Sequence, residues 1–293
     1  MPLARRTLLL AAATLPFAPA LAAGKRETLH AAERRIAALE RKAGGRLGVF
    51  VRDSGSGAEL AHRATERFAM CSTFKFLTAA AVLKKVDAGE LRLDKEIAYG
   101  EKDLLEYAPE TKKHVADGRM RLGDLCAAAI QWSDNTAANL ILAEVGGPAG
   151  FTRYARSVGD KVTRLDRTEP TLNTAIPSDL RDTTTPAAIA HTLETVLTKG
   201  VLSAASARQL EDWMIGDKVA DARLRAGLPK DWGIGDKTGT GDNGTANVVA
   251  IIRPPHRKPL FAAVYLTGSK GTPAERNAVH AAVGRLIGEV FAA

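Results

Sequence analysis

Ser72 and Lys75 combine a nucleophile and a base at a spacing that lets them act together. On a helix, residues three apart share a face, so the Ser72 hydroxyl and the Lys75 ammonium can meet about one turn apart. Serine is a weak nucleophile until a neighbour takes its proton, and a lysine can do so when burial and nearby cations lower its pKa. About one S-x-x-K is expected by chance in a chain of this length, so a helix start capped by serine is the alternative.

A second polar group, Ser133-Asp134-Asn135, precedes an apolar segment. In a catalytic interpretation the Ser133 hydroxyl shuttles a proton and the Asn135 amide binds the substrate. The alternative is structural, because aspartate at the Asp134 position is a residue type that caps the first turn of a helix. This segment taken alone fits both interpretations.

The stretch KTGTGDNG, residues 237–244, contains a G-x-G-x-x-G match. A dinucleotide-binding site needs such glycines between a strand and the start of a helix. Here residues 245–255 are rich in β-branched side chains and end in two prolines, so the glycines join two strands and a nucleotide site is disfavoured. We expect a hairpin whose first strand ends at Lys237 and Thr238, with Gly239 allowing a close approach to the backbone.

The three motifs S-x-x-K, S-D-N and K-T-G, in this order, form the motif set of class A β-lactamases and penicillin-binding proteins. Each motif is weak, but the ordered set is specific. Residues 167–173, RTEPTLN, resemble the loop that class A β-lactamases have and the transpeptidases lack. The similarity covers nearly the whole chain after the first 23 residues, and the sequence resembles a class A serine β-lactamase.

The resemblance implies a covalent mechanism centred on Ser72. Ser72 is expected to attack the carbonyl of a β-lactam amide and to form an acyl-enzyme. Its backbone N–H and that of Thr240 are expected to form the oxyanion hole. Ser133 is expected to pass a proton to the departing nitrogen, and Lys237 to keep the site electropositive.

Release of the acyl-enzyme is assigned by the same resemblance to Glu169 and Asn173, which lie four residues apart. Their carboxylate and amide are expected to hold one water, which Glu169 activates against the ester. The base for acylation is either Lys75 or Glu169 acting through a water, and both stay open. Arg167 is expected to pair with Asp182 at the neck of this loop; two independent surface charges are the alternative.

The carboxylate of a β-lactam needs cationic and hydroxyl partners, and Lys237, Thr238 and Thr240 fit that role. Many members of the family add an arginine on the strand after K-T-G, but the aligned residue here is Ala246. Other members place the guanidinium before that strand, where this chain has Arg223. Arg223 is therefore the candidate, and a solvated surface arginine is the alternative.

Three further residues complete the predicted substrate-binding set. Asn135 is expected to hydrogen-bond the substrate, and Gly239 to keep the strand edge narrow where the substrate lies. Tyr107 resembles the aromatic residue that flanks the mouth of the cleft, with an exposed loop tyrosine as the alternative.

The two cysteines, Cys71 and Cys126, depart from the disulfides of the family. In one subgroup the Cys126 position pairs with a cysteine where this chain has Ala79. In many carbapenem-hydrolysing members the Cys71 position pairs with a cysteine where this chain has Gly241. We therefore expect two free thiols, which weakens a carbapenemase interpretation without excluding it. The resemblance itself implies penicillins and cephalosporins as substrates, and the sequence leaves the full spectrum open.

Two alternatives compete with a β-lactamase. A D-alanyl-D-alanine carboxypeptidase or transpeptidase of the same fold would form the acyl-enzyme but release it slowly, and Glu169 argues against it. A non-catalytic binding protein that keeps the fold would have lost at least one of Ser72, Lys75, Glu169 and Lys237, and all four are present.

The elements that must position these residues follow from hydrophobic periodicity and turn residues. In chain order we expect a helix at 28–42 ended by Gly44 and Gly45, a hairpin at 46–63, a mostly helical block at about 72–210, strands at 231–239, 245–255 and 259–268, and an amphipathic helix at 273–293. This pattern predicts an α/β fold in which both chain ends form an antiparallel sheet flanked by helices. An all-helical lobe is inserted between them, and the active site lies in the cleft. The α/β lobe is assigned to about 24–70 and 215–293, and the helical lobe to about 71–214.

Residues 1–23 are typical of a secretory signal, with a positive start, an apolar run and a small-x-small cleavage site at residues 20–22. A membrane anchor is the alternative, but the run is shorter than the ~20 apolar residues of a spanning helix and contains prolines. The mature chain, residues 24–293, is then expected in the periplasm or secreted, away from the membrane. Adjacent Arg5 and Arg6 leave both Sec and twin-arginine export open.

Composition is that of an ordinary globular protein, with 45% hydrophobic and 25% charged residues. Removing the two arginines of the signal takes the net charge from +8 to about +6 (+8 − 2), and the basic residues are scattered along the chain. With only 5% aromatic residues, base stacking and a nucleic-acid partner are disfavoured. The histidines show no ligand spacing, so we expect no zinc site, no cofactor and a monomer that binds small molecules.

Overall fold

The computed structural model describes the backbone of residues 18–292 and the side chains of residues 28–292. Most of the predicted signal segment, namely residues 1–17, lies outside the described residues. Within the described range no helix has the length and apolar character that a membrane span requires.

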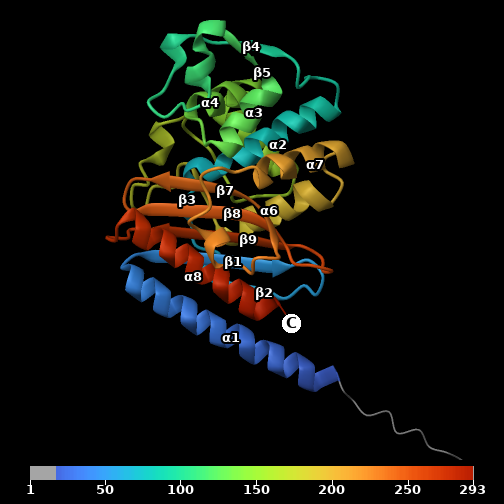
Figure 1. Ribbon diagram of the computed structural model, residues 1–293, viewed down its shortest axis with the longest axis vertical. Helices are drawn as coiled ribbons and strands as arrows, with labels where there is room; N and C mark the ends of the chain where they lie inside the picture. The colour runs from blue at the N-terminus through green and yellow to red at the C-terminus, as the bar shows by residue number, and fades with distance from the viewer. Residues whose placement is uncertain (1–17, 293) are drawn as a thin grey trace, which may run out of the picture.

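A five-stranded antiparallel sheet forms the centre of the molecule (Figure 1). Its strand order is β2-β1-β9-β8-β7, so strands from both chain ends lie side by side, as the sequence predicts. The strands are β1 (Arg46–Asp53), β2 (Glu59–His62), β7 (Gly233–Gly241), β8 (Thr245–Arg253) and β9 (Leu260–Thr267). The K-T-G motif lies on β7, which occupies one edge of the sheet.

The central strands are apolar on both faces. On β8, Val248, Ala250 and Ile252 pack into one buried cluster, whereas Val249 and Ile251 pack into another. Successive side chains of a strand point to opposite faces, so this continuous apolar run requires a helical layer on each side of the sheet.

Helices from the chain ends and from the middle supply these layers. α1 (Ala18–Ala43) and α8 (Pro273–Phe291) lie side by side on one face (Figure 1). On the other face α6 (Pro186–Thr198) packs against β1, β8 and β9, and α7 (Ala204–Ile215) packs against β7. Gly44, at φ +66°, ends α1 where the sequence predicts its end.

A helical block next to the sheet holds the rest of the core. Its helices are α2 (Phe74–Asp87), α3 (Leu122–Gln131), α4 (Asn135–Glu144) and α5 (Gly147–Ser157). α2 is central, because every residue from Phe74 to Leu83 is buried. α6 and α7 belong by sequence to the predicted helical lobe, but they pack against the sheet. The residue boundaries of the two lobes therefore stay a prediction.

The short elements of the middle segment were not predicted. β3 (Phe68–Ala69) pairs with β6 (Thr183–Thr184), and β4 (Glu96–Ala98) pairs with β5 (Arg119–Arg121). The short 3₁₀ helices are η1 (Cys71–Thr73), η2 (Glu101–Asp103), η3 (Thr111–Asp117), η4 (Thr171–Asn173) and η5 (Leu224–Gly227). Elements of this length carry too few residues for a periodic pattern to be detected.

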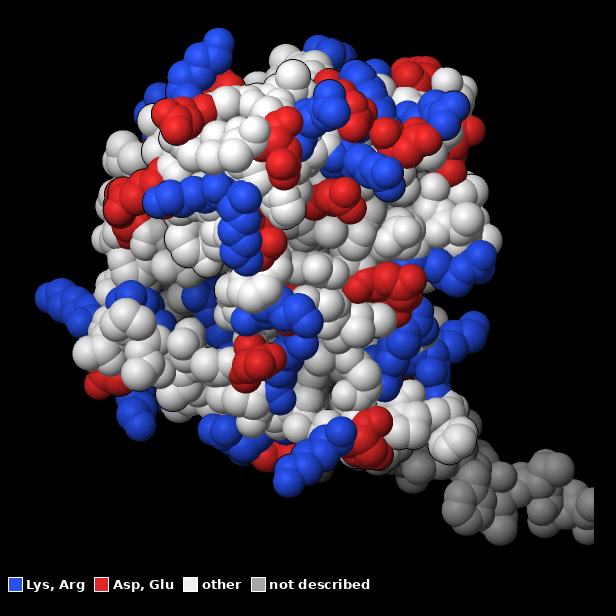
Figure 2. Space-filling view, turned by 45° about the horizontal axis from the view of Figure 1, so that its top comes forward, with Lys and Arg blue, Asp and Glu red and all other residues white. Residues whose placement is uncertain are grey.

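Charged side chains are spread over the surface (Figure 2). On the face shown, Lys and Arg lie among Asp and Glu instead of forming one basic stripe. This distribution agrees with the scattered basic charge of the sequence.

Candidate active site

Ser72 lies in η1, between β3 and the central helix α2. Cys71 before it has φ +46°, a left-handed conformation that is uncommon outside glycine. The start of this turn is fastened to the sheet by Asn247 on β8, whose amide donates to the carbonyls of Ala69 (2.9 Å) and Met70 (3.1 Å). The sheet therefore fixes the position of Ser72 at the entrance to α2.

Gly239 allows the edge strand β7 to approach this turn. A Cβ at Gly239 would lie 2.8 Å from the carbonyl oxygen of Met70 and 3.2 Å from the backbone nitrogen of Thr73. The close approach predicted at this glycine is thus made by the protein's own chain. It brings the K-T-G strand next to Ser72.

Lys75 is fully buried and contacts three of the other predicted site residues. Its ammonium lies 3.0 Å from Glu169 Oε1 and donates to Asn135 Oδ1 at 2.7 Å and to the Ser133 carbonyl oxygen at 2.8 Å. The Ser72 hydroxyl donates to the same Glu169 oxygen at 3.2 Å. Glu169 therefore links the hydroxyl and the ammonium that the sequence expected to meet directly. Burial lowers the pKa of Lys75, and the Glu169 carboxylate opposes this shift.

Ser133 and Asn135 are positioned by the residue between them. Asp134 is the N-cap of α4, because its carboxylate accepts from the Ala137 N–H at 2.8 Å. It also accepts from the N–H of Thr111 at 2.8 Å and is fully buried. Ser133 has φ +58°, a conformation that costs a non-glycine residue free energy. The structural interpretation of this motif thus holds, and the cap fixes the two flanking side chains.

Lys237 is the second buried lysine of the site. Its ammonium donates to Ser133 Oγ at 3.1 Å and to the Thr238 carbonyl oxygen at 3.0 Å. Lys75 Nζ lies 3.4 Å from the same Ser133 oxygen, so this hydroxyl contacts two ammonium groups. Burial lowers the pKa of Lys237 to about 8; Asp217 raises it, and Lys75 lowers it further.

Glu169 lies on a loop and is held in place by α4. Asn139 on α4 donates to the Glu169 carbonyl oxygen and accepts from the Glu169 N–H, both at 3.0 Å. Asn173 Nδ2 donates to Glu169 Oε2, the second oxygen of the carboxylate. Asn139 was not predicted as a site residue, although it lies four residues after Asn135 on the same face of α4.

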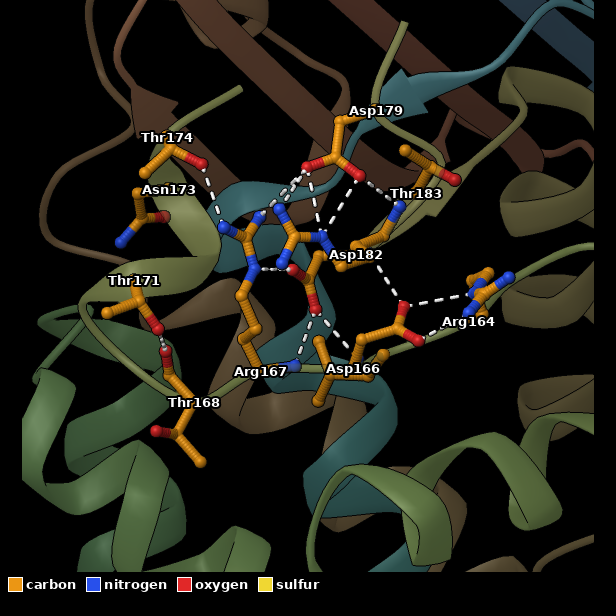
Figure 3. Close-up of polar contacts among 12 residues, drawn as sticks. Arg164, Asp166, Arg167, Thr168, Thr171, Asn173, Thr174, Asp179, Asp182 and Thr183 are labelled. Carbon is orange, nitrogen blue, oxygen red and sulfur yellow. Dashed lines mark hydrogen bonds and ion pairs between the residues drawn. The ribbon is translucent and has the colours of Figure 1, made fainter. Parts of the chain in front are cut away.

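Arg167 and Asp182 join the two ends of this loop, residues 166–182, which we call the Glu169 loop (Figure 3). Arg167 Nε donates to Asp182 Oδ2 at 2.6 Å. The backbone N–H groups of Asp166 and Arg167 donate to Asp182 Oδ1 at 2.7 and 2.9 Å. Asp182 is fully buried, so the interpretation of this pair as independent surface charges is wrong.

Arg223 is buried, and the alternative of a solvated surface arginine is therefore wrong. Its guanidinium donates to the carbonyl oxygens of Gly239 and Asn247, both at 2.8 Å. It also donates to Thr240 Oγ1 at 2.7 Å and to Asn277 Oδ1 at 3.0 Å. Burial lowers the pKa of Arg223 to about 10. Arg223 thus contacts β7 from the interior of the protein. Of its partners on β7, Thr240 is exposed at the surface.

Tyr107 is tied to the site through its backbone. Its carbonyl oxygen accepts from the Asn135 N–H at 3.0 Å, while its side chain is 49% exposed. This exposure suits an aromatic residue at the mouth of a cleft and an ordinary loop tyrosine equally well.

Both cysteines, Cys71 and Cys126, are free and buried. Burial raises the pKa of both thiols. A Cβ at Gly241 would lie 2.6 Å from Cys71 Sγ, so the position of the cysteine found in many carbapenem-hydrolysing members faces Cys71 here. Within the part of the chain that the structure describes, no three His, Cys, Asp or Glu side chains are grouped as metal ligands.

The fold and this cluster of side chains define a serine β-lactamase of class A. The chain belongs to the β-lactamase enzyme family, whose model matches residues 31–291. It is 44% identical to β-lactamase Toho-1 of Escherichia coli over 291 residues, which cover 98% of each protein. The ancestral class A β-lactamase GNCA is 56% identical and superposes with a TM-score of 0.87, over 89% of this chain and 100% of that one. The last common ancestor of Gram-negative bacteria class A β-lactamase GNCA4 is 57% identical, with a TM-score of 0.88 over 89% and 99% of the two chains.

These relationships confirm the resemblance found in the sequence. They identify the protein as a hydrolase that acts on β-lactams, and they favour this activity over the transpeptidase and binding-protein alternatives.

Proposed function

We propose that the protein hydrolyses the amide bond of penicillins and cephalosporins through an acyl-enzyme on Ser72, which water activated by Glu169 then releases. The observation that carries this proposal is the surroundings of the Glu169 carboxylate. One oxygen accepts from Ser72 Oγ at 3.2 Å, and the other accepts from the Asn173 amide. A single carboxylate thereby reaches both the nucleophile and the amide that can hold a water.

Acylation begins when Ser72 Oγ attacks the lactam carbonyl carbon, after which the bond from this carbon to the ring nitrogen breaks. The hydroxyl proton passes to the Lys75–Glu169 pair, whose charged groups are 3.0 Å apart. Ser133 then delivers its proton to the departing nitrogen and takes a proton from the Lys75 ammonium, which lies 3.4 Å from its oxygen. Its hydroxyl is suited to this because two ammonium groups, those of Lys75 and Lys237, contact its oxygen.

Substrate binding is assigned to the edge of β7. The backbone N–H groups of Ser72 and Thr240 stabilise the oxyanion. Thr238 and Thr240 bind the substrate carboxylate together with Lys237. Arg223 adds positive charge from within the protein and orients the Thr240 hydroxyl, to which it donates at 2.7 Å.

Two residues contact the remainder of the substrate in this proposal. The Asn135 amide hydrogen-bonds it, and Tyr107 flanks the entrance. Gly239 contributes by letting β7 approach the turn that carries Ser72.

Deacylation uses a water held between Glu169 and Asn173. The water oxygen attacks the ester carbonyl carbon, Glu169 takes its proton, and Ser72 Oγ leaves and recovers a proton. Support for this water comes from Asn173 Oδ1, which is buried and has no hydrogen-bond partner among the described residues. A buried acceptor of this kind is normally satisfied by an ordered water.

We further propose that the signal of residues 1–23 is removed after export by the Sec or the twin-arginine route. The mature chain, with its lobes at about 24–70 with 215–293 and at 71–214, then acts as a monomer in the periplasm or outside the cell. There it protects the cell from β-lactam antibiotics and needs no cofactor.

Hydrolysis of a chromogenic cephalosporin by the purified mature protein tests the proposal. Ser72→Ala should abolish turnover, and Glu169→Gln should accumulate a covalent adduct that mass spectrometry detects. Glu90→Gln, at a carboxylate that is 60% exposed, is the matched control and should turn over normally. Turnover by Glu169→Gln at the unmutated rate would contradict the proposed release step.

Two further assays distinguish the β-lactamase from the carboxypeptidase alternative and define the substrate spectrum. Release of D-alanine from a peptide ending in D-alanyl-D-alanine, faster than β-lactam hydrolysis, would favour the carboxypeptidase. A panel of penicillins, early and bulky cephalosporins and carbapenems then defines the substrates.

A further inference from the structure

A cavity of about 610 Å³ lies between the second half of the Glu169 loop and the ends of β1, β3 and β9. Residues 175–181 of the loop line it, whereas Ser72, Lys75 and Glu169 do not. Its volume lies within the range of about 300–1,000 Å³ that is typical of sites for small molecules. The cavity is therefore separate from the active site and large enough for a ligand of its own.

Apolar side chains form a large part of the lining. Ile176 and Leu180 on the loop are 50% and 56% exposed, and they are two of the five large apolar side chains that are largely exposed in the described part of the chain. Pro177 and the ring of Phe68 line the same cavity. The apolar part of a ligand would remove these side chains from water, which is favourable.

Arg67 also lines the cavity, and its charge has no partner there. Its Nη1 donates to the Val162 carbonyl oxygen at 3.1 Å and to Thr183 Oγ1 at 2.9 Å, both neutral oxygens. Among residues 28–292, Nε and Nη2 have no hydrogen-bond partner, and no carboxylate oxygen lies within 4.0 Å of this guanidinium. Nε and Nη2 form the edge of a guanidinium that binds a carboxylate through two parallel hydrogen bonds.

The other charged residues that line the cavity are already neutralised in ion pairs. These pairs are Arg46–Glu66, Arg167–Asp182 and Arg181–Asp179. Arg67 therefore supplies one positive charge that needs an anion from outside the described chain. An occupant that complements both the charge and the lining is an anion with an apolar body.

The loop segment beside the cavity has a backbone that its surroundings must hold in place. Ala175, Ser178 and Asp182 have φ of +43°, +68° and +56°, left-handed conformations that cost a non-glycine residue free energy. A ligand that binds only this conformation of the loop stabilises it.

We propose that the cavity binds a carboxylate on an apolar body, such as a medium-chain fatty acid, and that this ligand holds the Glu169 loop in place. The carboxylate binds the Nε and Nη2 edge of Arg67, and the alkyl chain packs on Ile176 and Leu180. Arg67 lies before β3, outside the loop, so the ligand joins the loop to the body of the protein. For its effect on catalysis this inference rests on the proposed function, in which Glu169 acts in the release step.

NMR of the backbone amides and the arginine Nε–H groups, with octanoate as the probe, tests the binding without reference to catalysis. Octanoate should shift the Arg67 Nε–H and the amides of residues 175–181, and the shifts should saturate. Arg67→Gln should weaken binding about tenfold or more, because it removes a charge-assisted pair of hydrogen bonds. Arg92→Gln, at a side chain that is 80% exposed and outside the cavity, is the matched control and should bind octanoate normally.

Simpler compounds separate the two halves of the proposed ligand. Acetate has the charge without the chain and 1-octanol has the chain without the charge, so each should bind at least about tenfold more weakly than octanoate. Leu180→Gln, at an exposed side chain, should weaken octanoate binding about fourfold, and it decides the matter if Arg67→Gln does not fold. Unshifted resonances at residues 175–181, or equal octanoate affinity in these variants and the unmutated protein, would overturn the proposal.

Hydrogen exchange of the loop amides tests whether the ligand holds the loop. Octanoate at about ten times its dissociation constant should slow this exchange about tenfold, as expected for a ligand that binds only the ordered loop. The same concentration should leave the exchange in Arg67→Gln nearly unchanged. Unchanged exchange in the unmutated protein, with the site occupied, would overturn the stabilising role.

Asp182→Asn provides the catalytic test, because this substitution is expected to loosen the loop. Octanoate should raise its kcat for a chromogenic cephalosporin by up to about tenfold, and should not do so in Arg67→Gln/Asp182→Asn. Octanoate that binds in the active site would instead raise KM and leave kcat unchanged, and this result would overturn the link to the release step. If the unmutated protein hydrolyses no β-lactam, the proposed function fails, and NMR and hydrogen exchange still decide the binding.

Discussion

Replacing Asp182 is expected to release the Glu169 loop from the body of the protein (Figure 3). Asp182 Oδ1 accepts from two backbone N–H groups, those of Asp166 and Arg167, and Oδ2 accepts from the Arg167 guanidinium. Asp182→Asn keeps the first oxygen and places an amino group where the second one was. Asp182→Ala removes both, so the two variants should form a graded series.

The contacts that each Asp182 variant loses determine the expected loss of stability. The lost charge-assisted hydrogen bond from Arg167, 2.6 Å in length, contributes about 2–3 kcal/mol, and this is the expected loss of stability for Asp182→Asn. Asp182→Ala removes one partner of a buried ion pair, which costs about 3–5 kcal/mol. Asp179→Asn is the matched control on the same loop. Its main partner is the half-exposed Arg181, and such pairs contribute about 0.2–1 kcal/mol.

Three measurements test how releasing the Glu169 loop affects stability and catalysis. Urea unfolding gives the loss of stability, and hydrogen exchange of the loop amides locates it. Because Glu169 is proposed to act in the release step, kcat should fall about 100-fold in Asp182→Asn, the factor that a misplacement of ~1 Å can cause, while the acyl-enzyme accumulates in the mass spectrum. If Asp182→Asn matches Asp179→Asn in stability, in hydrogen exchange and in kcat, the Arg167–Asp182 pair does not hold the Glu169 loop in place.

Three further outcomes are expected. Burial lowers the pKa of His280 from 6.5 to about 3, so below pH 6.5 the unfolded chain binds a proton that the folded one does not. Stability is therefore complete above pH 6.5 and falls by about 3 kcal/mol down to pH 4.5, and urea unfolding of His280→Gln should lack this contribution. Gly241→Ala would place its Cβ 2.5 Å from the Asn173 carbonyl oxygen, so steady-state kinetics should show kcat reduced about tenfold or more, with the burst of acylation retained. EDTA should leave the hydrolysis rate unchanged, and a loss that zinc reverses would contradict the metal-free mechanism.

The sheet could be predicted from the sequence because its strands and turns carry strong local signals. The run of β-branched residues at 245–253 reads as a strand whatever surrounds it, and the glycines before it join two strands as expected. The order of the S-x-x-K, S-D-N and K-T-G motifs likewise indicated which side chains gather, although their contacts were unknown.

Contacts between distant segments could not be predicted in the same way. Arg223 has no local feature that distinguishes a buried guanidinium from a solvated one, because its partners Gly239 and Asn247 lie 16 and 24 residues away. Asn139 reads as an ordinary helical residue until the Glu169 loop is placed against it.

The two buried lysines, Lys75 and Lys237, differ in the groups that their ammonium groups contact, and this difference suggests different roles. Lys75 has Glu169 as its partner, and Glu169 also accepts from the nucleophile. In the proposed mechanism a proton that passes to Glu169 removes the counter-charge of Lys75, so the pair can exchange protons during both steps. Lys237 instead donates to two neutral oxygens, Ser133 Oγ and the Thr238 carbonyl oxygen. We therefore propose that Lys75 transfers protons, while Lys237 keeps the site electropositive during these transfers.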